Sequence, residues 1–146
     1  MDALFTAARA ALHNTRIPLT IPTILADGTQ DYELSDDLAS AHHIYGYEKV
    51  PITMTMNVIS QNYIVDATLS EEACSSSRLI VAVNRDGGIC GIRKGGEGGI
   101  TGDLISEMVD RGKELGVEVI KKLDSALERE NEKMQHGSNS KVGFFA

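Results

Sequence analysis

Three carboxylates near the middle of the chain, Asp66, Glu71 and Glu72, are close enough in sequence to act together. Clustered acids can hold a divalent metal ion, or pass a proton to and from a substrate. The polar residues that follow, from Ser75 to Arg78, add hydroxyls and a guanidinium but no further acid. A fixed positive charge such as that of Arg78 repels a metal ion and is a poor catalytic group. We therefore expect no catalytic residue and no metal site here.

The residues that follow these acids predict a β-hairpin. Residues 79–83 form a short apolar run rich in β-branched side chains, which is typical of a buried strand. Asp86-Gly87, or Gly87-Gly88, can supply the positive φ angles of a type I′ turn, and residues 89–93 then form the antiparallel return strand. Glu71 and Glu72 are expected in the turn before the first strand. The glycines of residues 95–99 predict a loop.

Amphipathic helices are predicted at both ends of the chain. Asp2 can cap a helix that ends near His13. Apolar residues gather on one side of this helix: Leu4, Phe5, Ala8, Ala11 and Leu12. A long second helix is predicted over residues 102–133 from an apolar stripe at helical spacing. Gly112 and Gly116 lie in that stripe. Each costs the helix about 1 kcal/mol relative to Ala, so we expect close packing against the sheet there.

The rest of the chain adds strands and turns. Residues 52–58 alternate apolar and polar side chains, which predicts a strand with one packed face, and residues 63–66 predict the next strand. Upstream we expect an extended segment over 17–25, a turn at Asp27-Gly28, a short strand over 31–34 and a loop over 35–47. The predicted fold class is α+β, with a mixed, largely antiparallel sheet packed with helices.

Four further motifs invite a functional interpretation, and for each we expect a structural role. The glycine loop at 95–99 could cradle a phosphate, but it lacks a P-loop Gly-Lys-Ser/Thr, and Glu97 would repel an anion. His42-His43 has no further ligand at metal-binding spacing. Asp36-Asp37 is expected in a turn or cap. The serines of residues 75–77 have no recognisable base to activate a nucleophile.

Arg93 and Lys94 are the best local basic pair, directly after the predicted return strand. Their positive charges could contact a backbone phosphate of RNA, and the alternative is a pair that simply faces solvent. The sequence leaves both interpretations open. Arg93 and Lys94 are the candidate RNA-contact residues of the chain.

Composition fits one domain with its own core, since the 146 residues are 42% hydrophobic and 24% charged. Cys74 and Cys90 do not make a disulfide framework, so reduced thiols are expected. No apolar run approaches the roughly 20 residues of a membrane span, and the N-terminus lacks the pattern of a signal peptide. With a net charge of −7, a broad basic RNA-binding surface is not expected. RNA contacts would be local, or made through a larger assembly.

The stretch from Asp66 to Gly99 resembles the second half of RNase PH-family proteins. In the phosphorolytic members an Asp begins the motif, an acidic pair follows and two further acids precede the next strand. Asp66 and Glu71-Glu72 match this pattern, but the two later acidic positions fall on Ser76 and Arg78. The resemblance therefore implies a family member that has kept the framework and lost the chemistry.

Other motifs are similar to one lineage of this family, the RNase PH-type ring subunits of the exosome. They fall at residues 2–4, 10–12, 14–18, 33–37 and 141–144. The resemblance implies a non-catalytic ring subunit without a cofactor, which supports 3′-to-5′ RNA processing and degradation, including rRNA maturation. It implies other RNase PH-like exosome subunits as partners in a hetero-oligomeric ring, with RNA bound through the assembled complex. It also implies a location in the nucleus, nucleolus and cytoplasm, with no membrane contact.

The resemblance covers almost all of the chain, but only about the second half of a usual family member. We therefore expect an N-terminally truncated RNase PH-like domain over residues 1–134 and a C-terminal tail over 135–146. The apolar end of this tail, at 142–146, is expected to be a docking element. Two alternatives remain. An active phosphorolytic exoribonuclease would need acids at Ser76 and Arg78. A stand-alone α+β domain that binds a small molecule would need a convergent polar pocket.

Overall fold

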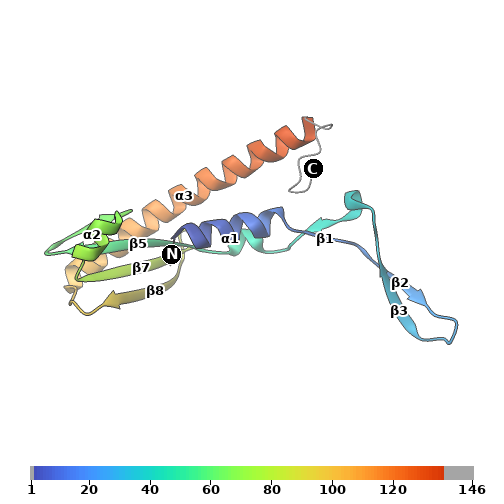
Figure 1. The fold of residues 1–146 in the computed structure, drawn as a ribbon, viewed down its shortest axis with the longest axis horizontal. Coiled ribbons are helices and arrows are strands. Elements are labelled where there is room, and N and C mark those ends of the chain that lie inside the picture. Colours follow the sequence, from blue (N-terminus) through green and yellow to red (C-terminus); the bar gives the residue numbers. More distant parts are fainter. Residues whose placement is uncertain (1, 137–146) are drawn as a thin grey trace.

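A four-stranded antiparallel sheet, with strand order β6-β5-β7-β8, is the framework of the fold (Figure 1). The computed structural model describes residues 2–136. The sheet strands are β5 (Ile52–Ile59), β6 (Asn62–Val65), β7 (Ser77–Val83) and β8 (Ile89–Gly96). Every strand pairing within the described residues is antiparallel. The predicted α+β class is confirmed.

Helices and short strands complete the described chain. The α-helices are α1 (Asp2–Asn14), α2 (Leu69–Cys74) and α3 (Gly102–His136). The predicted loop over 35–47 holds more structure than expected, with the 3-10 turn η1 (Leu38–Ser40), the strand β4 (His42–His43) and the start of the 3-10 turn η2 (Tyr47–Lys49). β4 pairs with β1 (Arg16–Ile17). Helix α3 crosses the predicted boundary at residue 134, and the apolar end at 142–146 lies outside the described residues.

The hydrophobic core lies between the sheet and α3. The apolar side chains of residues 52–58 are all buried, as predicted, but the prediction of a single packed face is wrong, because Thr53 and Asn57 on the other face of β5 are buried as well. The core of strand and helix side chains consists of Ile52, Met54, Met56 and Val58 from β5, Leu79, Val81 and Val83 from β7, and Met108 and Ile120 from α3. The apolar faces of β5 and β7 therefore meet the apolar stripe of α3 across a single interface.

Two glycines let α3 approach the sheet closely. A Cβ added at Gly112 would lie 3.0 Å from Met56 Cε and 3.2 Å from Val81 Cβ. One added at Gly116 would lie 3.1 Å from Val83 Cβ. These separations are shorter than ordinary contacts between carbon atoms. The prediction that both glycines serve close packing against the sheet is confirmed.

The face that α1 turns inward differs from the predicted one. Leu4 is 71% exposed, and Phe5, Ala8 and Ala11 are exposed as well, whereas Arg9 is only 1% exposed. The apolar pattern is misleading here because the surface that meets α1 is lined with carbonyl and carboxylate oxygens. Those acceptors select a guanidinium instead of a methyl group.

Arg9 joins α1 to two distant parts of the chain. Its Nη1 atom donates to the carbonyl oxygens of Glu48, at 3.0 Å, and Val50, at 2.7 Å. Its Nη2 atom donates to the carboxylate of Asp124 on α3 at 3.2 Å. Arg85 also approaches Asp124, at 3.7 Å, but that arginine is largely exposed. One buried side chain therefore holds the N-terminal helix against both η2 and α3.

The hairpin between β7 and β8 turns differently from the prediction. A type I′ turn needs positive φ at both central residues, but in this turn only Gly87 has one, at 77°. Asn84 controls the turn, because its side-chain oxygen accepts hydrogen bonds from the backbone N–H groups of Asp86 and Gly88. The type I′ prediction is wrong because it left out this side-chain acceptor, which stabilises a longer loop.

A substitution at Arg9 tests its role in holding the fold together. Arg9→Met removes the guanidinium and leaves the carboxylate of Asp124 and two carbonyl oxygens without it. Breaking a buried ion pair by removing one partner costs about 3–5 kcal/mol. We expect the free energy of unfolding, measured by urea denaturation, to fall by about 3 kcal/mol because Asp124 keeps some access to water.

Arg85→Met is the matched control, since it removes the exposed cation from the same carboxylate. Exposed ion pairs contribute about 0–1 kcal/mol, so this variant should change stability by less than that. Equal losses in the two variants would contradict a special role for Arg9.

Candidate functional site

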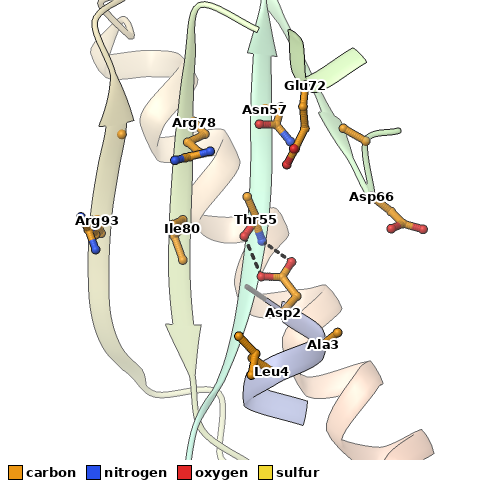
Figure 2. A pocket seen from close by; sticks show the side chains of 12 residues that line it. Asp2, Ala3, Leu4, Thr55, Asn57, Asp66, Glu72, Arg78, Ile80 and Arg93 are labelled. Atoms are coloured by element: carbon orange, nitrogen blue, oxygen red, sulfur yellow. Dashed lines mark hydrogen bonds between the residues drawn. The ribbon is translucent and has the colours of Figure 1, made fainter. Parts of the chain in front are cut away.

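A polar cavity of about 560 Å³ lies on the face of the sheet opposite α3 (Figure 2). Its walls come from the start of α1, the middle strands β5 and β7, the edge strand β8, the turn after β6, and α2. These elements are distant in sequence, and the sheet brings them together. The cavity is the strongest candidate functional site within the described residues, because it gathers charged and polar side chains of both signs.

Strand register decides which side chains reach the cavity. Directly opposed residues of an antiparallel pair share a face of the sheet. Thr55, Ile80 and Arg93 are opposed across three neighbouring strands and form one row. Asn57, Arg78 and Gly95 form the next row. Both rows line the cavity.

Arg78 and Arg93 give the cavity its positive charge. Both side chains are exposed, and neither forms an ion pair with any residue in the range 2–136. Space for Arg78 comes from Gly95, where an added Cβ would lie 3.0 Å from the Arg78 Nε atom. Two guanidiniums are thus available to an anionic group, and guanidinium is well suited to bind phosphate or carboxylate oxygens.

The predicted acidic cluster is divided in the structure. Asp66 and Glu72 line the cavity, whereas Glu71 does not. Glu71 forms a capping box at the start of α2, in which its carboxylate accepts from Thr68 N at 2.8 Å while Thr68 Oγ1 accepts from Glu71 N. The hydrogen bonds from Thr68 lower the pKa of the Glu71 carboxyl. Glu71 therefore serves local structure, and two acids of the three remain for chemistry.

The expectation of a turn at Glu71-Glu72 is corrected to a short helix. The sequence held the signal, since Thr68 followed by Glu71 is the spacing of a capping box. A further carboxylate at the cavity, that of Asp2, was expected to cap α1. Instead it accepts hydrogen bonds from Thr55 N at 2.7 Å and Thr55 Oγ1 at 2.6 Å (Figure 2). Asp2 is thus used to join α1 to the sheet.

Asn57 was not recognised from the sequence as a site residue. Its side chain is 3% exposed, yet its amide forms no hydrogen bond within the described part of the chain. Asn57 and Glu72 both line the cavity, and Figure 2 shows Asn57 on the cavity side of β5. An amide at a cavity wall can both donate a hydrogen bond to a ligand and accept one from it. The sequence signal for Asn57 was its place among the polar residues that alternate with apolar ones over 52–58. Such a pattern indicates on which face of the strand a residue lies, but not what covers that face.

The structure separates the predicted basic pair. Arg93 lines the cavity, but Lys94 is opposed to Leu79 and so lies on the other face of the sheet. The Lys94 amine donates to the Gly96 carbonyl at 2.7 Å. Adjacent residues on a strand point to opposite faces, which is why a sequence pair is not a surface pair here. Only Arg93 shares the cavity with Arg78.

Ser76 and the histidine pair lie outside the cavity. The Ser76 carbonyl accepts from Gly98 N at 3.0 Å, which packs the glycine loop against this serine. His43 Nδ1 lies 3.0 Å from the His13 carbonyl oxygen, and the rings of His43 and His13 both contact the ring of Tyr47. Over residues 2–136, no group of three or more His, Cys, Asp and Glu side chains could hold a metal ion. Within the same range, no helix is long and apolar enough to cross a membrane.

Comparisons with known proteins agree on one family. Residues 49–114 match the model of the 3′ exoribonuclease family, domain 2. A Dictyostelium discoideum protein named "Putative exosome complex exonuclease RRP42" is 37% identical over 86% of this chain and 39% of its own length. The exosome complex component Rrp42 of Pyrococcus furiosus is 28% identical over 90% of this chain and 45% of its own length. The chain thus spans about two fifths of the relatives that it matches.

Solved structures agree on the fold. A chain of an archaeal exosome core aligns with a TM-score of 0.54 at 18% identity, over 78% of this chain and 40% of that chain. A chain of an Archaeoglobus fulgidus exosome with RNA bound to the active site aligns with a TM-score of 0.53 at 20% identity, over 77% of this chain and 38% of that chain. These likenesses show the fold, and the family match shows that residues 49–114 belong to the second domain of the RNase PH (3′ exoribonuclease) family.

Proposed function

We propose that the chain acts as a non-catalytic ring subunit of an exosome. Its neighbours are other RNase PH-like subunits in a hetero-oligomeric ring, and the assembled complex carries out 3′-to-5′ RNA processing and degradation, including rRNA maturation. We place this activity in the nucleus, nucleolus and cytoplasm. Relatives named as exosome components support the proposal, because they match 86% and 90% of the chain.

The position of Arg78 is the observation that carries the non-catalytic assignment. Its guanidinium shares the cavity with Asp66 and Glu72 and has no ion-pair partner among residues 2–136. A cation in this position repels a divalent metal ion and attracts an anionic group. The cavity is therefore better suited to bind an anion than to cleave a phosphodiester.

RNA contact is proposed to take place through the cavity and within the assembly. Arg93 and Arg78 offer two cations on one face of the sheet, and a phosphate of the RNA backbone is the group they would bind. The whole chain carries a net charge of −7, which opposes RNA binding by the subunit alone. Lys94, on the other face of the sheet, is not part of this contact.

Two other functions also have observations in their favour. An active phosphorolytic exoribonuclease is favoured by the exonuclease name of the Dictyostelium relative and by the carboxylates of Asp66 and Glu72 in one cavity. A stand-alone small-molecule-binding domain is favoured by the cavity itself, which supplies a convergent polar pocket with the unpartnered Asn57 amide. Activity and ligand-binding measurements separate the three.

The isolated chain should not shorten RNA. We expect no phosphate-dependent release of nucleoside diphosphates from single-stranded RNA, with or without Mg²⁺, because the positive charge of Arg78 opposes metal binding at the cavity. The measurement is chromatography of the products. An Asp66→Ala variant is the control for ribonuclease activity from contaminating proteins. Diphosphate release by the unaltered chain that disappears in this variant would establish the exoribonuclease alternative.

RNA affinity tests the cationic pair. Alone, the chain should bind single-stranded RNA no more tightly than a Kd of about 10⁻⁴ to 10⁻⁶ M, the range of non-specific electrostatic binding. In a complex with RNase PH-like subunits, Arg93→Ala should weaken RNA binding and reduce the slope of log K against log salt by about 0.7, the value for one lost phosphate contact on a single strand.

Lys94→Ala is the matched control, since it removes an adjacent positive charge from the opposite face of the sheet. It should leave RNA affinity and the salt slope of the complex close to those of the unaltered protein. Equal effects of the two substitutions would contradict a contact through the cavity. A nanomolar, salt-resistant complex of RNA with the isolated chain would contradict the assembly requirement.

A further inference from the structure

A β-hairpin extends away from the rest of the molecule (Figure 1). We call it the arm, and it consists of residues 19–35. Its strands are β2 (Thr20–Ile24) and β3 (Gln30–Leu34), and among the residues that the structure describes they pair only with each other. All side chains of β3 are exposed, and so are those of β2 except the half-buried Thr23.

The arm is locally well formed in spite of its exposure. Backbone hydrogen bonds continue the ladder at both ends, from Ser35 N to Leu19 O and from Leu25 N to Thr29 O. In the turn, the Asp27 carboxylate accepts from Thr29 N at 2.9 Å and Thr29 Oγ1 at 2.6 Å. These hydrogen bonds lower the pKa of the Asp27 carboxyl. Gly28 takes the positive φ of 83° that the turn requires.

One face of the arm is apolar. Pro22 opposes Tyr32, Thr20 opposes Leu34, and Ile24 opposes Gln30, so these side chains share a face. Ile24 is 76% exposed and Tyr32 is 66% exposed. We call Pro22, Ile24, Tyr32 and Leu34 the apolar face. The opposite face carries Asp31 and Glu33 beside Ile21 and Thr23.

Exposure of the apolar face of the arm to water is energetically unfavourable. An isolated two-stranded hairpin is marginally stable, and a contiguous exposed apolar surface usually marks a binding site. The charge of the segment indicates its partner. Residues 17–48 contain no Lys or Arg, whereas the arm and its base carry Asp27, Asp31, Glu33, Asp36 and Asp37. This negative charge excludes RNA and favours a protein surface with positive charges.

We propose that the arm docks its apolar face on a neighbouring RNase PH-like subunit, in an apolar groove bordered by Lys and Arg side chains. The identity of this partner rests on the proposed ring function. The apolar contact supplies the affinity, and the acidic residues speed association by attracting the basic border.

The test measures binding of the full chain to purified RNase PH-like exosome subunits by calorimetry and size-exclusion chromatography. The double variant Ile24→Thr/Tyr32→Thr removes apolar area but keeps residues that favour strands. We expect its affinity to fall at least tenfold while its melting temperature stays that of the unaltered chain. Ile21→Thr is the matched control on the opposite face, with an expected change below twofold.

Charge is tested separately. Asp31→Asn/Glu33→Gln should lower the association rate and its dependence on salt, with a smaller change in the dissociation rate. An association rate that does not change in this variant would overturn the electrostatic part of the proposal.

The outcomes distinguish the arm from the ring function. If the chain binds the subunits and the double variant binds equally well, the arm proposal is overturned and the ring function stands. If the unaltered chain binds no RNase PH-like subunit, both the ring function and the proposed partner of the arm are overturned. A homodimer that the double variant dissociates would overturn the proposed partner by showing a second copy in its place.

Discussion

The buried guanidinium of Arg9 is the contact on which the placement of the N-terminal helix depends. It meets the carbonyl oxygens of Glu48 and Val50 and the carboxylate of Asp124. A buried charge is tolerated only when it is paired and hydrogen-bonded, so this geometry allows α1 few other orientations. The Arg9 Nε atom is buried and has no hydrogen-bond partner among residues 2–136, which adds a cost that the other contacts must offset.

The candidate site follows from that placement. With Arg9 directed toward α3, the start of α1 meets β5, where Asp2 binds Thr55 and closes one wall of the cavity. The same orientation leaves Leu4 and Phe5 near the surface. Phe5 borders an apolar groove of about 280 Å³ together with Ile80 and Ile92. One polar contact thus determines both a polar site and a neighbouring apolar surface.

The cavity shows that the framework of the sheet and the side chains on its exposed face depend on different contacts. Within the family fold, the strand rows bring Asn57, Arg78 and Arg93 to one face with Asp66 and Glu72 nearby. The backbone positions depend on sheet register and on packing against α3, whereas the reactivity depends on side chains that contribute little to that packing. A guanidinium among these acids changes what the cavity can bind without disturbing the core on the opposite face.

The sequence alone determined the features that depend on local periodicity. The alternation over residues 52–58, the long amphipathic helix and the close approach at Gly112 and Gly116 were all predictable. Each rests on spacing along the chain, which dihedral geometry converts directly into a face of a strand or helix. The resemblance to the RNase PH family rests equally on residues near one another in sequence.

Only the tertiary structure decided the inward face of α1, the division of the acidic cluster and the separation of Arg93 from Lys94. The partners of Arg9 and Asp2 are distant in sequence, and apolar periodicity cannot indicate a helix face that meets buried oxygen atoms. Two adjacent basic residues look like one patch until strand register assigns them to opposite faces. In each case the deciding contact joins segments that come together only when the chain has folded.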